Sequence, residues 1–301
     1  MSAMRIATFI LSIFIVGMVE MMVAGIMNLM SNDLGVSDAI IGQLVTLYAI
    51  TFAIAGPILV KVTNRFSPRP VLLWALVMFM LGNVIIAVAP DFTILVFGRI
   101  LSSAAAALIV VKILALTALL TAPQHRGKMI GIVYSGFSGA NVFGVPIGTI
   151  IGDLVGWRFT FLFIVAVSIL VGILMYFYVP DPEFKASTTS TSSQKRGSSY
   201  SKILRPAEIT KYLGITFLLL VANSVTFIYI NPLVLSSGHD LSFVSIALLI
   251  NGIAGVIGTS MGGVLSDKLT SKRWLTIATS IFILMMLVLN VFLPGTGLLL
   301  M

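Results

Sequence analysis

Three ionisable side chains lie inside long apolar stretches of this chain, where water cannot solvate them. Glu20 lies within residues 6–28, and Arg99 and Lys112 lie within residues 93–120. A charge at such a position costs on the order of 3 kcal/mol unless it is paired or hydrated, so each is a candidate for function. Glu20 and Arg99 are at similar depth if each stretch is one helix. A carboxylate that alternates between a proton and an arginine partner would make a proton-coupling switch, whereas a permanent ion pair would only fix helix packing.

Lys112 points away from Arg99 on the same predicted helix. At about 100° per residue, the two side chains face directions roughly 140° apart. Lys112 either extends toward the cytoplasmic face or lines a cavity and binds an acidic group. Amide and phenol groups elsewhere in the stretches are further cavity candidates, although interhelical hydrogen bonds are the plainer role for each. As a set they suit a neutral or weakly polar solute. These candidates are Gln43, Tyr48, Asn83, Tyr134, Asn141, Asn223, Tyr229 and Asn251.

Nine apolar stretches must position these groups. The chain is 58% hydrophobic and only 9% charged, whereas soluble domains are about 25% charged. A spanning helix needs about 20 mostly apolar residues, and long unbroken runs indicate helices rather than barrel strands. We therefore predict an all-α polytopic membrane protein. The expected helices are 6–28, 39–60, 71–89, 93–120, 129–151, 159–179, 210–234, 242–265 and 274–293.

The loop charges alternate by side. If each stretch spans once, the basic loop residues fall on one side, and the other side carries Arg158 among several aspartates. This asymmetry predicts a cytoplasmic amino terminus, and it attributes the net charge of +8 to topology rather than to nucleic-acid binding. The first stretch contains Glu20 and is too long for a signal-peptide core, so we expect it to be retained as a helix.

One short loop pattern occurs twice. Residues 60–69 follow the second stretch and residues 263–272 follow the eighth, with Asn64 in register with Asp267. The repeat indicates two homologous halves, an architecture typical of transporters. Asp267 could pair with a neighbouring helix end and lock one conformation, or the charges could only set topology. The candidate gate residues are Asn64, Arg65, Arg69, Asp267, Lys268, Lys272 and Arg273.

Composition divides the chain into three parts. Residues 1–180 hold six predicted helices, residues 181–206 form a polar, Ser/Thr-rich linker expected to be flexible, and residues 207–301 hold three more helices. Six helices plus three is not a symmetric pair. We therefore expect that the second six-helix repeat is truncated after three helices.

The fifth predicted helix is rich in glycine. Gly144, Gly148 and Gly152 recur at every fourth position and form a flat face that another helix can approach closely. Pro146 removes a backbone donor and should bend the helix. Helix packing explains this face in any case, and it could also seal one side of a cavity.

The sequence lacks the residue patterns that several kinds of chemistry require. The chain has no cysteine, and we find no metal-ligand spacing, nucleophile motif, phosphate loop or carboxylate pair. We therefore expect no enzyme activity, no cofactor and no metal site. A channel would need rings of charge or a repeated filter, which we do not find.

These features together resemble the major facilitator superfamily and its drug:proton antiporter branch. Val264-Leu265-Ser266-Asp267-Lys268…Lys272-Arg273 is similar to the family's loop signature, and residues 60–69 are a weaker copy. Arg99 stands where the family has a helix-four arginine associated with proton coupling. Gly139–Gly152, with Gly139, Gly144, Pro146, Gly148 and Gly152, followed by Gly156-Trp157-Arg158, resembles the antiporter motif of helix five.

Other stretches narrow the resemblance. Gly17-Met18-Val19-Glu20, Gly42-Gln43-Leu44-Val45 and Gly144-Val145-Pro146-Ile147-Gly148 look most like bacterial efflux proteins for purine bases, nucleosides and arabinose. The resemblance implies a monomeric, proton-coupled exporter of the bacterial cytoplasmic membrane that binds a small organic solute and contributes to multidrug resistance. The sequence departs from the family pattern at Asn64, which replaces an acidic residue, and at the extra charge of Lys112. The rival interpretation is a truncated, non-transporting membrane protein or a sensor.

Overall fold

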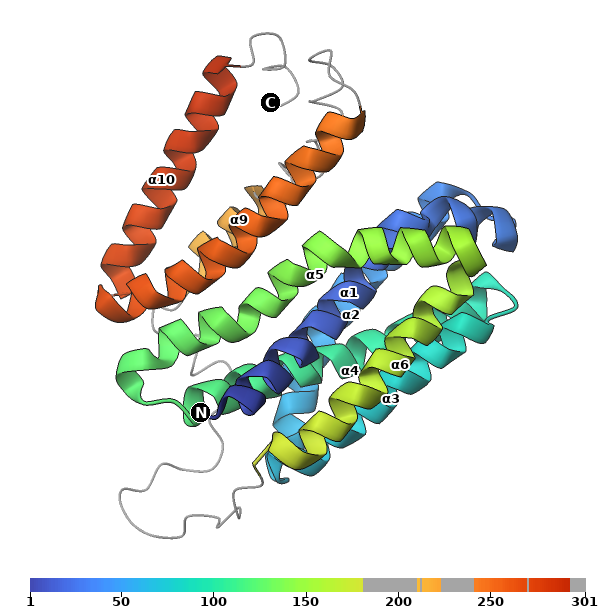
Figure 1. Cartoon of the computed structure of the whole chain (residues 1–301), viewed down its shortest axis with the longest axis horizontal. Helices are drawn as coiled ribbons and strands as arrows, with labels where there is room; N and C mark the ends of the chain where they lie inside the picture. The colour runs from blue at the N-terminus through green and yellow to red at the C-terminus, as the bar shows by residue number, and fades with distance from the viewer. Residues whose placement is uncertain (181–209, 212, 223–240, 270, 293–301) are drawn as a thin grey trace. The chain divides into compact units, whose positions relative to one another are not determined.

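The structure is a computed structural model that describes residues 1–180, 210–211, 213–222, 241–269 and 271–292 (Figure 1). Over these residues the chain is helical and contains no strand. The first six long helices are α1 (Ala3–Leu34), α2 (Asp38–Thr63), α3 (Pro68–Val88), α4 (Phe92–Leu119), α5 (Arg126–Val155) and α6 (Trp157–Tyr178), with a short 3-10 turn, η1 (Pro123–His125), before α5. Two later helices are α9 (Leu241–Lys268) and α10 (Ser271–Phe292).

The predicted all-helical fold is confirmed, and the helices extend beyond their apolar stretches. Helix α1 runs on to Leu34 because its stop signal is Gly35, which takes a left-handed conformation at φ 64°. Helix α4 starts where the Asp91 carboxylate accepts a hydrogen bond from the Ile94 N–H at 3.0 Å. The helix expected over 210–234 lies partly outside the described residues, which are helical over Leu213–Ala222.

Among the described residues, five helices are long and apolar enough to cross a membrane: the first part of α1, then α2, α3, α4 and α6. Helix α5 adds a sixth span if its two segments are taken together. These segments meet at an angle of 42° next to Pro146, as expected when proline removes a backbone hydrogen bond and crowds the preceding turn.

The chain forms two compact units, one of residues Met1–Phe184 with Ile250–Leu269 and the other of Lys185–Leu249 with Thr270–Met301. Within the first unit, α1 packs along α5, α3 packs on both α4 and α6, and α2 packs on α4 (Figure 1). Helices α3 and α4 approach most closely at Gly82, where an added Cβ would lie 2.6 Å from the Ser102 nitrogen. Small residues at such contacts let membrane helices pack without an aqueous driving force.

An ion-pair network joins three helices at the end of the unit where α1 stops. Arg158 Nη1 forms an ion pair with Asp33 Oδ2, and Arg158 Nη2 donates to the Ala89 carbonyl at 3.0 Å. The Trp157 indole N–H donates to the same Asp33 oxygen at 3.2 Å, and the guanidinium lies 4.4 Å from the indole centroid. The network ties the start of α6 to the last turn of α1 and the end of α3.

We expect a small, pH-dependent stabilisation from this ion pair. The hydrogen bond from Arg158 lowers the pKa of Asp33 below its usual value. A depressed folded-state pKa contributes stability above the unfolded pKa, near 4, and that stability is lost as the pH falls below it. Because both side chains are more than a third exposed, Asp33→Asn should cost under about 1 kcal/mol at pH 7.

Thermal unfolding between pH 7 and pH 3 checks this expectation. The difference in midpoint between the original chain and Asp33→Asn should shrink as the pH falls. Asp153→Asn is the matched control, because Asp153 is exposed and makes no ion pair among the described residues. A difference for Asp33→Asn that stays constant down to pH 3 would contradict the assigned role.

Candidate functional site

Arg99 is buried between three helices, with 1% of its surface exposed. It extends from α4, where Nη1 donates to the Val19 carbonyl of α1 at 2.9 Å and Nε lies 3.5 Å from the Leu44 carbonyl of α2. The guanidinium carbon lies 4.5 Å from the centroid of the Tyr48 ring. Backbone carbonyls and an aromatic face therefore hold the guanidinium, which is a favourable setting for a desolvated cation.

Two polar atoms in this cluster lack a hydrogen-bond partner within the described part of the chain. They are Nη2 of Arg99 and the hydroxyl of Tyr48, and both are fully buried. Ser103 of α4 donates to the Tyr48 backbone carbonyl at 2.6 Å, which fixes α2 against α4 at this level. Leaving buried polar groups unpaired costs roughly 1–3 kcal/mol each, so such groups mark a place where water, a proton or a solute can bind.

Glu20 lies beside this cluster without joining it directly. It is half-buried on α1 and is within electrostatic range of Arg99, Tyr48 and Tyr134. In the described residues, no basic group lies within the 4.0 Å that an ion pair requires of its carboxylate. Glu20 and Arg99 are thus within electrostatic range of each other, but no ion pair joins them.

The other predicted cavity residues occupy different surroundings. Gln43 is exposed on α2, whereas Asn83 is buried and donates to the Phe79 carbonyl of its own helix. Tyr134 is 37% exposed, and its ring stacks on Phe137 with centroids 5.6 Å apart. Asn223 and Tyr229 lie outside the described residues, as do the side chains of Asn141 and Asn251.

Lys112 lies at the opposite end of the unit from the Asp33 network, near the end of α2. Only 7% of its surface is exposed, and its ammonium donates to the Thr63 carbonyl at 3.4 Å. Thr63 ends α2, where backbone carbonyls have no helical partner and the helix dipole favours a cation. The contact with this helix end was not among the alternatives considered from sequence.

The glycine face of α5 packs on α1. An added Cβ would lie 3.4 Å from Met18 at Gly144, 2.8 Å from Met22 at Gly148 and 2.9 Å from Ile26 at Gly152. The closest approach lies further along the seam, at Gly136. A Cβ there would lie 2.4 Å from the Ile10 carbonyl oxygen. Gly139 has more room, because Phe14 is 3.7 Å away.

Asp267, at the end of α9, binds the first turn of α5 within the first unit. Its Oδ1 accepts from the Gly127 N–H at 2.8 Å and its Oδ2 accepts from the Lys128 N–H at 2.6 Å. Free N–H groups and a positive dipole end make a helix start a ready acceptor of a carboxylate. The helices also touch at Gly263, where an added Cβ would lie 2.3 Å from the Gly127 carbonyl.

The first loop copy lacks such a contact. Asn64 is the exposed residue after α2, and its side chain makes no hydrogen bond to another described residue. Arg65 stacks over Phe66 at 4.9 Å, and Arg69 stacks over Tyr176 of α6 at 4.7 Å. In the second copy, Lys268 and Arg273 are exposed, and the side chain of Lys272 is outside the described set.

Removing the charge of Asp267 should loosen the first turn of α5. We expect Asp267→Asn to cost about 1–2 kcal/mol of local stability, because the amide keeps one acceptor and loses the charge that favours the helix start. Amide hydrogen exchange at Gly127 and Lys128 should accelerate about tenfold or more. Lys268→Gln, which changes an exposed neighbour, should leave these rates unchanged. Equal exchange in both variants would contradict the capping role.

These features define a polytopic helical membrane protein with buried charges between its spans. The chain belongs to the Major Facilitator Superfamily, whose sequence profile matches residues 9–301. Members of this family are transporters, not enzymes, so the chain is placed in a family of membrane transport proteins.

Named relatives are similar over most of this chain. The uncharacterized MFS-type transporters YtbD and YbcL of Bacillus subtilis are 32% and 29% identical, each over 85% of the chain. The putative transporter AraJ of Escherichia coli is 24% identical over 93%. The chain spans 64% of the length of the two Bacillus proteins and 69% of AraJ.

Solved structures share the fold. The proton:xylose symporter XylE, bound to 6-bromo-6-deoxy-D-glucose, superposes with a TM-score of 0.64 at 16% identity, covering 88% of this chain and 69% of XylE. A bacterial homologue of the human lysosomal transporter Spinster, inward-facing and unoccupied, gives 0.57 at 19% identity, covering 90% of this chain and 64% of the homologue.

Two contacts of the site escaped prediction from sequence. The Ser103–Tyr48 hydrogen bond has no sequence signal, since serine is common in apolar helices and its acceptor is a backbone carbonyl. The Asp33–Arg158 pair did leave a sequence signal, because Arg158 is the lone basic residue assigned to its side of the membrane. A lone cation among aspartates is a candidate for ion pairing.

Proposed function

We propose that the chain carries out proton-coupled export of a small organic solute by alternating access. In this mechanism Glu20 carries the coupling proton and Arg99 tunes its release. The observation that carries the proposal is a half-buried carboxylate beside a fully buried arginine with no ion pair between them. A permanent structural pair would instead hold the two groups in contact.

The cluster around Arg99 supports a coupling role. A carboxylate within electrostatic range of a cation favours its charged form more strongly as the cation approaches. A small movement of α4 against α1 would therefore change the proton affinity of Glu20. Arg99 Nη2 supplies an unpaired donor, and the unpaired Tyr48 hydroxyl can donate or accept, so a water or solute can bind to both groups.

The contact between Asp267 and α5 supports an inner gate. Two charge-assisted hydrogen bonds join the end of α9 to the start of α5, and the helices can separate only when both break. The gate residues of both loop copies lie on the side that carries the basic loops, which we assign to the cytoplasm. The bent, glycine-faced α5 on α1 would seal one wall of the solute cavity.

The proposed solute class rests on the phenol and amide side chains predicted in the spans, of which Tyr48 lies in the Arg99 cluster, and on the resemblance of the sequence to efflux proteins. Phenol and amide groups suit nucleobases, nucleosides or sugars, and the drug:proton antiporter resemblance adds lipophilic cations. We place the protein in the bacterial cytoplasmic membrane, and the E. coli relative YdhP is named as an inner membrane transport protein. In the first half, the solute site would lie at mid-depth beside α1, α4 and α5.

A flux assay tests the proposal. The purified chain is reconstituted in liposomes with an imposed pH gradient, and uptake of adenine, uridine, arabinose and the dye ethidium is followed by tracer or fluorescence. We expect one class to accumulate against its gradient and the accumulation to stop when a protonophore is added. Absence of flux for every class, in liposomes that hold folded protein, would favour a non-transporting membrane protein or a sensor.

A further inference from the structure

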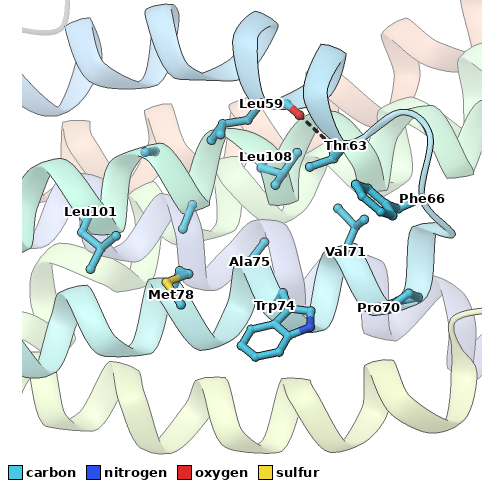
Figure 2. Close-up of a pocket in the computed structure, with 12 residues that line it drawn as sticks. Leu59, Thr63, Phe66, Pro70, Val71, Trp74, Ala75, Met78, Leu101 and Leu108 are labelled. Atoms are coloured by element: carbon cyan, nitrogen blue, oxygen red, sulfur yellow. Dashed lines mark hydrogen bonds between the residues drawn. The ribbon is translucent and has the colours of Figure 1, made fainter.

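A surface groove between α2, α3 and α4 is separate from the Arg99 cluster. It has a volume of about 560 Å³, and its walls include Leu59, Val71, Trp74, Met78 and Leu108 (Figure 2). Trp74 is 65% exposed and Phe66 at its end is 49% exposed, so the groove opens at the surface of the unit. The hydroxyl of Thr63 is already bonded to the Leu59 carbonyl at 2.7 Å, and the lining is therefore almost entirely apolar.

One end of the groove carries a buried cation without a counter-charge. Lys112 follows Leu108 by one helical turn on the same face of α4, and its ammonium contacts the carbonyl of Thr63, which lines the groove. An ammonium has three donors, and this contact uses one of them at 3.4 Å. No carboxylate in the described residues lies within ion-pair distance of Lys112.

Further basic groups surround the same end. Lys61 is exposed in the last turn of α2, and the Arg65 guanidinium lies over the ring of Phe66, another lining residue. In contrast, the lining from Ala75 to Met78 and at Leu101 is apolar. The groove is thus amphipathic along its length, with positive charge at one end only.

The groove and the cation beyond its end together span about one membrane leaflet. From Leu101 to Lys112, α4 rises about 16 Å at 1.5 Å per residue, which is close to half of a hydrocarbon core about 30 Å thick. The cationic end lies on the side of the basic loops, which the positive-inside rule assigns to the cytoplasm. The cytoplasmic leaflet is also the one that carries anionic lipids.

We propose that this groove binds one anionic phospholipid of the cytoplasmic leaflet. An acyl chain lies along Leu108, Ala104 and Met78, and the headgroup phosphate accepts hydrogen bonds from the Lys112 ammonium. The phosphate supplies the missing counter-charge, and the apolar walls exclude water from the chain. Because α2 also carries Tyr48, the lipid would steady the helix that holds the aromatic face against Arg99.

Native mass spectrometry of the purified full chain tests the assignment. The protein is delipidated in detergent and titrated with dioleoyl phosphatidylglycerol, dioleoyl phosphatidylcholine or oleate. We expect one bound phosphatidylglycerol, with an affinity at least about tenfold above that of phosphatidylcholine. Lys112→Met should weaken phosphatidylglycerol binding by about tenfold or more, as expected when one partner of a buried charge pair is lost. Lys112→Arg should keep most of the affinity.

Two more variants separate specific binding from general attraction. Lys61→Met removes an exposed charge from the same end of α2 and should change affinity by less than about twofold, which is the scale of a weak surface contribution. Ala104→Phe fills the groove, leaves Lys112 in place and should weaken binding as strongly as Lys112→Met does. The proposal would be overturned if both phospholipids bound with equal affinity, or if Lys112→Met bound phosphatidylglycerol as tightly as the original chain does. It would also be overturned if oleate bound as tightly as phosphatidylglycerol.

Discussion

Glu20→Gln should abolish solute accumulation driven by a pH gradient while the protein still inserts and folds. Glutamine keeps the size and hydrogen-bonding capacity of the side chain but cannot release a proton. No other carboxylate among the described residues of the spans lies near Arg99, so no second carrier is at hand. Gradient-driven uptake of the solute identified in the liposome panel should fall by at least about a hundredfold, which corresponds to about 2.7 kcal/mol.

Exchange transport separates lost coupling from lost folding. With solute on both sides and no pH gradient, Glu20→Gln should still exchange labelled for unlabelled solute, because exchange needs no net proton movement. Asp38→Asn is the matched control, since it removes an exposed carboxylate from the first turn of α2, and it should keep full accumulation. Normal accumulation in Glu20→Gln would remove Glu20 from the coupling role and leave the fold assignment untouched.

Gly136→Ala should destabilise the first unit by about 1–3 kcal/mol, the usual cost of overpacking a tight contact. The new methyl group would lie 2.4 Å from the Ile10 carbonyl oxygen. This neighbour is backbone, so α1 and α5 must move apart to relieve the clash. The α1–α5 seam also brings the Glu20 helix against the bent helix, and we therefore expect flux to fall together with the unfolding temperature.

Gly139→Ala is the matched control on the same helix. Its methyl group would lie 3.7 Å from the Phe14 ring, which is an ordinary contact. Alanine also favours a helix over glycine by about 1 kcal/mol, so this variant should unfold at the same temperature or slightly higher. Thermal unfolding in detergent, followed by tryptophan fluorescence, measures both. An equal fall in unfolding temperature for the two variants would show that the close approach at Gly136 does not determine the stability of the unit.

The family and the helical fold could be predicted from sequence, and the reason is physical. A bilayer requires long apolar runs with their backbone groups bonded internally, and loop charges report their side, so composition and order alone determine the spans. The bend of α5 was predictable because proline acts on its own helix. The extent of α1 was not, because its stop depends on the left-handed Gly35 rather than on hydropathy.

The choice among glycines illustrates what sequence could not decide. The repeat at Gly144, Gly148 and Gly152 marked a face, and that face does meet α1, yet the tightest contact of the seam is at Gly136, before the motif begins. Spacing shows which residues share a face, but the distance between two helices depends on both partners and their crossing. Likewise, the pattern around Asp267 suggested a helix-end contact. Only the fold shows that the backbone N–H groups at the start of α5 are the donors to its carboxylate.

The sequence by itself determined that Glu20, Arg99 and Lys112 lie in the membrane, because apolar flanks leave no other solvent for them. Tertiary structure decided their partners. Arg99 is held by the carbonyls of Val19 and Leu44 and by the Tyr48 ring, and Lys112 is held by the carbonyl of Thr63. Every residue carries a carbonyl, so such partners leave no mark in the sequence. They become specific only when packing brings one helix end or one turn within reach of the cation.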